Sequence, residues 1–374
     1  MRIAVNTRLL LKNRLEGIGW FTYESFKRIC TAHPEHEFFF IFDRKWDEDF
    51  IFSGNITPIA VPPQARHPLL YYAWFNYSIP AVLKKLQPHL FISPDGYLPL
   101  SPKTKTIAVF HDLNFEHYPK DLPLAEHIYY RRYFPRFAAK ATRIGTVSEY
   151  SKNDISRTYN IDPQKIDVLY NGANESYRPV DEFTKTVTKR IYSRGKPYFL
   201  YVGALNPRKN LANLLKAFDV FRKNSNEEIN LVVVGAKMWR TSAISKAWEE
   251  LQFRDDVLFC GRLETDELRN VIGSALALTY VSYFEGFGIP IVEAFYCDTP
   301  VITSNVTSMP EVAGDAAMLV NPFSVNSIAD AMHQVASSED LRKSLVLRGR
   351  LRRREFSWQK TADRFWKTIE KTLE

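Results

Sequence analysis

The densest group of chemically capable residues lies in the segment 281–294, which reads VSYFEGFGIPIVEA. An apolar stretch precedes it, and its proline marks the start of a helix. Gly286 and Gly288 allow the backbone to come close to a ligand, while Glu285 and Glu293 supply two carboxylates. Carboxylates accept hydrogen bonds from hydroxyl groups, and amides at a helix N-terminus attract anions. The segment therefore predicts a site for a ligand with many hydroxyls and an anionic group. The alternative is a turn residue at Glu285 and a helix-dipole partner at Glu293.

A second group follows the apolar stretch 199–202. The chain continues as GALNPRKN, in which Arg208 and Lys209 stand directly before a predicted helix over 211–221. Arginine offers a planar fork of donors and lysine a point charge, so the pair predicts a cradle for phosphate oxygens. Basic residues are also common in exposed loops, and it is the position at the carboxyl end of a strand that favours the binding role.

The amino-terminal half carries weaker signals. Gly17 and Gly19 stand between the opening apolar stretch and a helix, where backbone amides can approach a diphosphate. Thr22 breaks the GxGxxG pattern, and no GxxxxGK[ST] occurs, so dinucleotide oxidoreductases and P-loop NTPases are poorly supported. His111 ends a later strand, and a neutral imidazole there can hydrogen-bond a sugar hydroxyl; the alternative is a structural histidine. The other histidines show no metal-ligand spacing, so no metal site is expected.

Short apolar, β-branched stretches alternate with helix-length segments along the whole chain, and several are apolar on both faces, as parallel strands covered by helices must be. The predicted strands are 2–6, 37–43, 90–93, 105–110, 142–146, 165–169, 198–202, 230–234, 257–260, 275–281, 300–303 and 317–320. The pattern predicts an α/β protein of two doubly wound, Rossmann-like domains that face each other across a cleft, with ligands outside the carboxyl ends of the strands. We expect an amino-terminal domain over 1–178, a linker over 179–197, a carboxyl-terminal domain over 198–352 and an amphipathic helix over 353–374.

The composition is that of a folded protein. The chain has 374 residues, of which 45% are hydrophobic and 25% charged, a length that suits two cores rather than one. No apolar run reaches the ~18 residues that span a bilayer, and the chain opens directly into a predicted strand. Cys30, Cys260 and Cys297 are odd in number and far apart, so we expect buried thiols in a reducing cytosol, without a disulfide scaffold or a structural zinc site.

The net charge is +8 and the pI about 9.2, and the excess is concentrated locally. One basic group comprises Arg131, Arg132, Arg136, Lys140 and Arg143, and a second spans Arg342, Lys343, Arg348, Arg350, Arg352, Arg353 and Arg354. These residues fit a solvated helix face with a basic connector. They also fit attraction to anionic lipid or to a polyanionic substrate, and least well nucleic acid.

Together these elements resemble the retaining glycosyltransferases of the GT-B fold, in the large family four, over nearly the whole chain. In the first half, the elements that resemble family motifs are the glycine loop 17–19, the histidine motif 111–113, the serine motif 146–151 and the Asn-Gly segment 170–173. In the second half they are the basic diphosphate loop 203–210, the base-bordering segment 261–263, the Glu-x7-Glu signature 285–293 and the Pro-Glu helix start 308–312. One departure is that Ser308 and Met309 replace the usual glycine pair before Pro-Glu.

The resemblance implies a nucleotide-diphosphate sugar held mainly by the second domain and an acceptor bound mainly by the first. Arg208 and Lys209 would neutralise the departing diphosphate, Glu285 would hold sugar hydroxyls, and His111 would contact the sugar. The donor-binding set carried over from the family comprises Gly17, Gly19, Arg262, Leu263, Phe287, Gly288, Ile289 and Glu293. No metal and no cofactor are implied, because fixed cations and amides take over the charge-stabilising role of a metal. The expected outcome is retention of anomeric configuration, with the departing phosphate acting as base.

The run 202–210 most resembles mannosyltransferases of surface-polysaccharide pathways, so GDP-mannose is the expected donor and UDP-glucose, UDP-galactose or a UDP-N-acetylhexosamine the alternative. The expected acceptor is a glycan or a lipid-linked oligosaccharide. The basic, aromatic stretch 129–143 would suit the anionic inner face of a membrane, or it is simply a helix packed by its aromatic side chains. Two other classes are alternatives. One is a nucleotide-sugar epimerase, for which no acid–base pair is present beyond the glutamates. The other is a basic nucleic-acid-binding protein, which leaves the glutamate and glycine residues of 285–293 unexplained. We expect no nucleic-acid partner.

Overall fold

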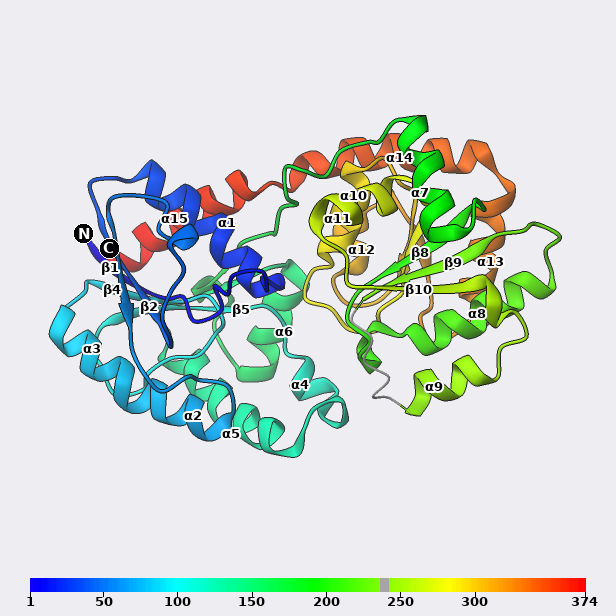
Figure 1. Ribbon diagram of the computed structural model, residues 1–374. Coiled ribbons are helices and arrows are strands. Elements are labelled where there is room, and N and C mark those ends of the chain that lie inside the picture. Colours follow the sequence, from blue (N-terminus) through cyan, green and yellow to red (C-terminus); the bar gives the residue numbers. More distant parts are fainter. Residues whose placement is uncertain (236–241) are drawn as a thin grey trace. The chain divides into compact units, whose positions relative to one another are not determined.

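A computed structural model describes residues 1–235 and 242–374 of the chain. The chain forms two compact units, one of residues 1–172 together with 358–374 and the other of residues 173–357. Each unit is built on one parallel sheet, and each is described by itself below (Figure 1).

The first unit contains a seven-stranded sheet in the order β3-β2-β1-β4-β5-β6-β7. Its strands are β1 (Arg2–Asn6), β2 (Glu37–Phe42), β3 (Ile56–Ala60), β4 (Leu90–Ser93), β5 (Lys105–Phe110), β6 (Arg143–Thr146) and β7 (Ile166–Val168). Its helices are α1 (Gly17–Ala32), α2 (Pro68–Ala73), the π-helical turn η2 (Trp74–Ser78), α3 (Ile79–Leu86), α4 (Asn114–His117), α5 (Leu124–Lys140), α6 (Glu149–Tyr159) and α15 (Trp358–Leu373). Every strand pair is parallel, as the two-sided apolar runs of the sequence predict.

Alternate residues of these strands serve the two faces of the sheet. Phe39 packs in the core cluster that contains Trp74 and Phe137 from the helices on one face. Its neighbour Phe40 meets Phe26 of α1, at a ring-centroid distance of 6.1 Å. The period-two alternation of a strand thus buries consecutive aromatic residues in two different cores.

Helix α15 returns from the carboxyl end of the chain to pack in the first unit. Phe365 lies 5.4 Å from the ring of Phe26 and 5.8 Å from that of Phe21 in α1. Thr361 Oγ1 donates a hydrogen bond to Tyr170 O, and Lys105 Nζ donates to Leu373 O at 2.9 Å. The helical apolar stripe predicts a core-facing helix, and the structure shows which core it faces.

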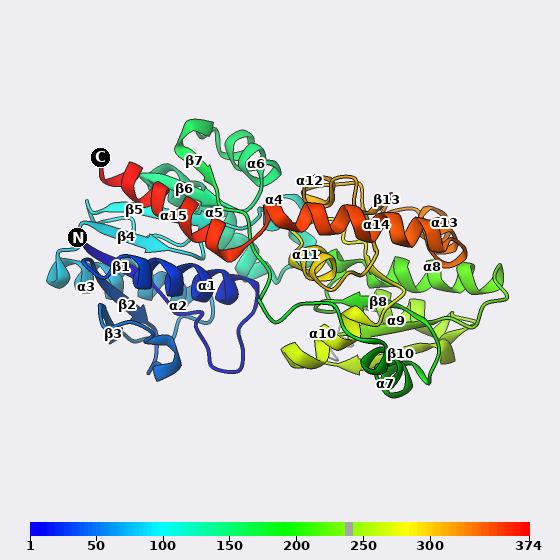
Figure 2. The ribbon, with the colours of Figure 1, turned by 90° about the horizontal axis from the view of Figure 1, so that it is seen from above.

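The second unit contains a six-stranded sheet in the order β10-β9-β8-β11-β12-β13. Its strands are β8 (Tyr198–Val202), β9 (Asn230–Val234), β10 (Val257–Gly261), β11 (Ala277–Tyr280), β12 (Val301–Ser304) and β13 (Met318–Val320). Its helices are α7 (Glu182–Ser193), α8 (Leu211–Lys223), α9 (Ser242–Glu249), α10 (Thr265–Gly273), α11 (Ile289–Tyr296), α12 (Met309–Ala313), α13 (Val325–Ser337) and α14 (Glu339–Arg352). Figure 2 shows α13 beside α8 in this unit, and side chains of both helices belong to its hydrophobic core.

The observed units and the expected boundaries differ in two respects. The segment 179–197, expected as a linker, contains α7 and belongs to the second unit, whose first residue is Ala173. Residues 353–357 also belong to that unit, and the chain passes to the first unit at Trp358. Polar composition suggested a linker because α7 buries only one side, at Thr188 and Ser193.

Two further expectations concern membranes and thiols. Among residues 1–235 and 242–374, no helix combines the length and apolar character needed to cross a bilayer. All three cysteines are free thiols; Cys30 and Cys297 are buried, whereas Cys260 is only partly buried and so departs from the prediction of three buried thiols.

Candidate functional site

Three of the predicted residues meet at the carboxyl edge of the second sheet. Arg208 and Lys209 follow β8, and Glu285 follows β11, the strand next to β8. Arg208 Nη1 lies 2.8 Å from Glu285 Oε2, and Lys209 Nζ lies 2.6 Å from Glu285 Oε1. Adjacent parallel strands end at one edge, which is why segments separated by more than seventy residues form one cluster.

The cluster is desolvated and carries a net positive charge. The side chain of Glu285 is 8% exposed, that of Lys209 13% and that of Arg208 22%. Burial raises the pKa of Glu285, but the adjacent charges of Arg208 and Lys209 outweigh it and lower that pKa to about 2. Glu285 therefore remains ionised between two partly buried cations, an arrangement that can attract an anionic ligand.

Neighbouring side chains fix Lys209 in place. Its Nζ atom donates a hydrogen bond to the hydroxyl of Tyr280 and lies 4.9 Å from the centre of that ring. Its backbone N–H donates to Asn206 Oδ1 at 3.2 Å. Tyr280 ends β11 and is 1% exposed, so the sheet itself orients the ammonium group. Tyr280 is not among the residues predicted from the sequence, because a tyrosine at the end of an apolar strand is typical of a hydrophobic core.

Asn210 ties the loop after β8 to the rest of the edge. Its Nδ2 group donates to Val281 O at 2.9 Å and to Pro322 O at 2.7 Å. Its own φ of +60° places it in the left-handed region, which asparagine tolerates better than most residues. The basic loop is therefore anchored on both sides of the charged pair.

Ser308 and Met309, which depart from the family pattern, contact the glycine loop 285–288. Ser308 Oγ, fully buried, donates to Glu285 O at 2.9 Å and to Phe287 O at 3.2 Å. Gly288 has a φ of +100°, and a Cβ atom there would lie 2.9 Å from Cε of Met309. Gly288 precedes Ile289, the first residue of α11, so glycine is required where the loop turns into the helix.

The aromatic ring of Phe287 is buried, so only the backbone of this residue can face a ligand at the loop. Its side chain is 3% exposed and packs edge-on against Phe356 at 5.5 Å. The ring anchors the loop in the core of the unit.

Glu293 lies on α11 and has a different environment from Glu285. It is half-buried, and it accepts a hydrogen bond from Tyr177. Burial raises the pKa of Glu293 to about 7, an effect that the Tyr177 hydrogen bond partly opposes. The two carboxylates of the signature are therefore distinct: one is firmly ionised, and the other holds a proton in mildly acidic solution.

Arg262 and Leu263 follow β10, two strands from β8 at the same edge of the sheet. Arg262 is exposed and Leu263 half-buried. Close backbone packing brings these strand ends together: Gly235 N donates to Gly261 O at 2.9 Å, and a Cβ atom at Gly235 would lie 2.1 Å from Gly203 O. Only glycine fits at that crossing.

The predicted residues of the first unit lie at the carboxyl edge of its own sheet. His111 follows β5, is half-buried, and donates from Nε2 to Pro94 O at 2.8 Å. Burial lowers the pKa of His111, so the ring is neutral near pH 7 and its Nδ1 is an acceptor. Phe21, one turn into α1 from Gly17, packs edge-on against the ring at 5.0 Å. A Cβ atom at Gly19 would lie 3.0 Å from Leu9 O, so this glycine allows the preceding loop to pack on α1.

An ion pair that the sequence did not reveal lies at the same edge. Arg8 Nε donates to Asp95 Oδ2 at 2.6 Å, and the two side chains are 7% and 4% exposed. Asn6 Nδ2 donates to Asp95 Oδ1 at 2.8 Å, and the Arg8 guanidinium lies 4.7 Å from the ring centre of Tyr97. A lone arginine and aspartate eighty-seven positions apart give no spacing signal, so only the fold could pair them.

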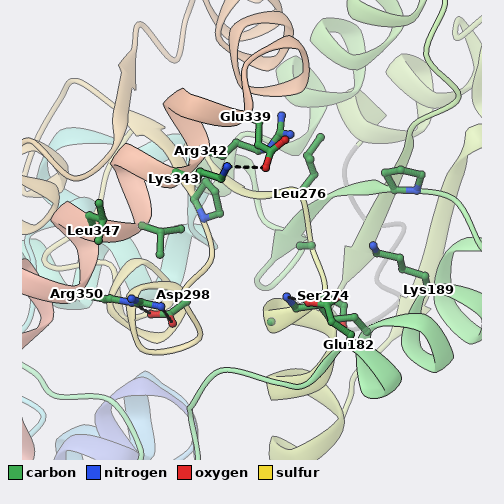
Figure 3. A pocket seen from close by; sticks show the side chains of 16 residues that line it. Glu182, Lys189, Ser274, Leu276, Asp298, Glu339, Arg342, Lys343, Leu347 and Arg350 are labelled. Carbon is green, nitrogen blue, oxygen red and sulfur yellow. Dashed lines mark hydrogen bonds and ion pairs between the residues drawn. The ribbon is translucent and has the colours of Figure 1, made fainter.

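A separate cavity of about 750 Å³ opens at the opposite edge of the second sheet. Pro197, Leu276 and Pro300, which line it, precede β8, β11 and β12. Figure 3 shows charged side chains around it, among them Arg350 beside Asp298 and Lys343 paired with Glu339. These cations are already neutralised by carboxylates, so the cavity differs from the cluster of Arg208, Lys209 and Glu285.

Two units, each built on one parallel sheet with its helices, form the architecture of the GT-B fold. The model of the family described as "Glycosyl transferases group 1" matches residues 184–352. The model described as "Glycosyltransferase Family 4" matches residues 30–177. The chain belongs to this glycosyltransferase family and is a hexosyltransferase.

Curated relatives and solved structures agree with this assignment. The chain is 30% identical over 287 residues to the O-antigen chain mannosyltransferase RfbU of Salmonella typhimurium, covering 76% of each chain. It is 26% identical over 369 residues to O-antigen chain mannosyltransferase B of Escherichia coli, covering 93% of this chain and 94% of the relative. The crystal structure of Anabaena HepE in complex with UDP and glucose superposes with a TM-score of 0.78 at 12% identity, covering 99% of this chain and 100% of that one; this likeness concerns the fold.

Proposed function

We propose that the protein transfers mannose from GDP-mannose, with retention of configuration, to a glycan or lipid-linked oligosaccharide in surface-polysaccharide synthesis. The observation that carries the proposal is the desolvated pair Arg208 and Lys209 around Glu285 at the carboxyl edge of the second sheet. The mannosyltransferase names of the two relatives support the choice of sugar.

In this proposal each member of the cluster has one role. The bond between C1 of the sugar and the diphosphate oxygen breaks, and Arg208 and Lys209 stabilise the charge that accumulates on the leaving group. Glu285, ionised at every physiological pH because its pKa is about 2, accepts hydrogen bonds from sugar hydroxyls. The acceptor hydroxyl attacks on the face that the diphosphate leaves, and the departing phosphate takes its proton. These two fixed cations supply the charge that a divalent metal supplies in other transferases.

The remaining residues of the donor set complete the proposed site. The loop of Phe287, Gly288 and Ile289 places backbone amides at the start of α11, and Glu293 holds the ribose. Arg262 and Leu263 border the base, while Gly17 and Gly19 lie at the start of α1. His111, neutral through burial, contacts a sugar hydroxyl.

The donor is tested by calorimetry and thermal unfolding with GDP-mannose, GDP, UDP-glucose, UDP-N-acetylglucosamine and UDP, with EDTA in every sample. GDP-mannose and GDP are expected to raise the melting temperature by mass action, and Lys209→Ala is expected to lose most of that increase. A response confined to a UDP-sugar would replace the proposed donor. A response to none of the five would overturn the proposed function.

We further propose that the first unit rests on the anionic inner face of a membrane, where a lipid-linked acceptor is located. The exposed arginines Arg131, Arg132 and Arg136 lie on α5. Large apolar side chains are exposed beside them on α2, η2 and α5, namely Leu69, Tyr72, Tyr77, Leu124 and Ile128. The ring of Tyr72 meets that of Tyr133 on α5 at 6.0 Å, which joins these elements into one surface. Basic and apolar groups together favour binding at a lipid interface.

The buried aromatic residues of α5 have another role. Tyr129, Phe134 and Phe137 belong to the core cluster of the first unit, so they pack the helix and do not face solvent. The membrane proposal therefore rests on the exposed residues alone.

Sedimentation with vesicles containing phosphatidylglycerol is expected to capture the parent protein but not the variant with Arg131, Arg132 and Arg136 changed to Gln. Neutralising Lys343, Arg348 and Arg354 in the second unit is the matched control, and equal loss in both variants would contradict the proposal.

A further inference from the structure

The turn between α1 and β2 gathers three side chains with metal-binding atoms. His33 follows α1 directly, and the backbone N–H of His36 donates to His33 O at 3.2 Å. Nδ1 of His33 lies 3.6 Å, and Nε2 of His36 3.3 Å, from the same atom, Oε1 of Glu35. No metal-ligand spacing was expected among these histidines, because the side chains of His33, Glu35 and His36 come together only when the chain turns sharply.

These distances suit a small divalent cation. Zinc bonds of about 2.0–2.1 Å to imidazole nitrogen and carboxylate oxygen in a tetrahedron put the ligand atoms roughly 3.3–3.4 Å apart. The three ligand atoms of His33, Glu35 and His36 all lie within 4.8 Å of one another. Two imidazoles and one carboxylate are a ligand set that zinc favours.

The turn is held in this shape by residues outside it. Asn55 Nδ2 shares its hydrogens with His33 O and His36 O, both at 3.0 Å, and with a third carbonyl in α1. Trp366 of α15 stacks on the ring of His33 at 3.5 Å and on that of His36 at 5.2 Å. The two imidazole planes differ by only 4°. A site whose ligands are already oriented loses little conformational entropy when an ion binds.

We propose that His33 Nδ1, Glu35 Oε1 and His36 Nε2 bind Zn²⁺ or a chemically similar divalent transition-metal ion, with water in the fourth position. The His33 and His36 side chains are 25% and 15% exposed and that of Glu35 is 59% exposed, so solvent and ion have access. The amino-terminal nitrogen of Met1 lies 3.1 Å from Nδ1, the other ring nitrogen of His36. Such outer contacts orient metal-binding imidazoles.

The ion would have a structural role. The turn precedes β2 and therefore lies at the amino-terminal edge of the first sheet, whereas His111 lies at its carboxyl edge. By fixing the two rings on which Trp366 stacks, the ion stabilises the packing of α15 in the first unit. Binding of this kind raises the melting temperature in proportion to the logarithm of free metal above the dissociation constant.

The test uses the full-length, tag-free protein, stripped with EDTA, dialysed and held at pH 8. Zn²⁺ is added in a calorimeter, and Co²⁺ is added separately because its visible absorption reports coordination geometry. One Zn²⁺ per chain is expected to bind at micromolar concentration and to raise the melting temperature. His36→Asn and Glu35→Gln are expected to weaken binding at least about tenfold. His67→Asn, an exposed histidine of the same unit, is the matched control and is expected to bind as the parent does.

The proposal is overturned by absence of saturable zinc binding in the micromolar range, or by unchanged affinity in both His36→Asn and Glu35→Gln. The Glu35 variant guards against a folding artefact, because its side chain is mostly in solvent. None of these measurements uses a nucleotide sugar, so the metal site and the proposed transferase function stand or fall separately.

Discussion

The carboxyl edges of the two sheets differ in how their charged side chains are paired. At the second edge, Arg208 and Lys209 both contact the carboxylate of Glu285, and both cations remain partly exposed. At the first edge, Arg8 is matched one-to-one with Asp95, and both are buried. The same topology therefore carries two cations around one carboxylate in one unit and a buried one-to-one ion pair in the other. The difference supports the proposal that an anionic ligand binds at the second edge, whereas the neutral ring of His111 lies at the first.

The largest expected effect concerns the structural pair. Asp95→Asn leaves Arg8 as a buried charge without its counterion, and breaking such a pair costs about 3–5 kcal/mol of unfolding free energy. Denaturant unfolding of the first unit measures this loss. Asp49→Asn, which removes an exposed carboxylate of the same unit paired with Lys12, should change the same quantity by less than about 1 kcal/mol. A loss of similar size in both variants would show that burial does not distinguish the two pairs.

Substitution of Lys209, in the charged cluster of the second unit, is expected to lower turnover and to leave stability nearly unchanged. Lys209→Ala removes one preorganised cation, for which a fall in kcat of roughly 10²–10³-fold is expected, while Arg208 still neutralises Glu285 and the fold persists. Steady-state kinetics and circular dichroism measure the two properties. Lys216→Ala, an exposed lysine on α8, is the control and should match the parent. Turnover within twofold of the parent would remove Lys209 from the site.

Glu285 and Glu293 of the second unit differ in pKa, so they are expected to affect the pH dependence of stability differently. Burial raises the pKa of Glu293 to about 7, above the ordinary value of about 4.3 that it has in an unfolded chain. Its protonated form therefore contributes stability that is fully present below pH 4.3 and is lost as pH rises through 7. At about 1.4 kcal/mol per pH unit the loss approaches roughly 4 kcal/mol.

Glu293→Gln should remove that pH dependence. Without donor, the variant and the parent are expected to unfold alike near pH 4.5, and the variant should be more stable at pH 8. Tyr177→Phe removes a hydrogen bond that lowers the pKa of Glu293, so it should move the loss of stability to higher pH. Parallel stability curves for the parent and the Gln variant from pH 4.5 to 8 would contradict the assignment.

The sequence predicted those parts of the molecule that depend on local pattern. Two-sided apolar runs predicted the parallel strands of both sheets, and the strand-loop-helix order predicted that Arg208 and Glu285 each lie at the carboxyl end of a strand. The edge strand β3 was not predicted, because Pro58 lies in its centre and proline in a strand is tolerated only at an edge or bulge. Arg8 with Asp95, and Tyr280 with Lys209, could not be predicted, since each pair depends on which strands become neighbours.

The smallest expected effect tests whether the second edge needs its buried support. Tyr280→Phe keeps the ring beneath Lys209 Nζ but removes the hydroxyl that accepts its hydrogen bond. One such bond contributes about 1 kcal/mol, and kcat/KM should therefore fall by about fivefold with little change in melting temperature. If Tyr280 only fills the core, activity would stay at the parental level; if it orients the ammonium group, the loss should disappear in a Lys209→Ala background, where the hydroxyl has no cation to position. A full additional loss in the double variant would assign Tyr280 a contact of its own and separate it from the cationic pair.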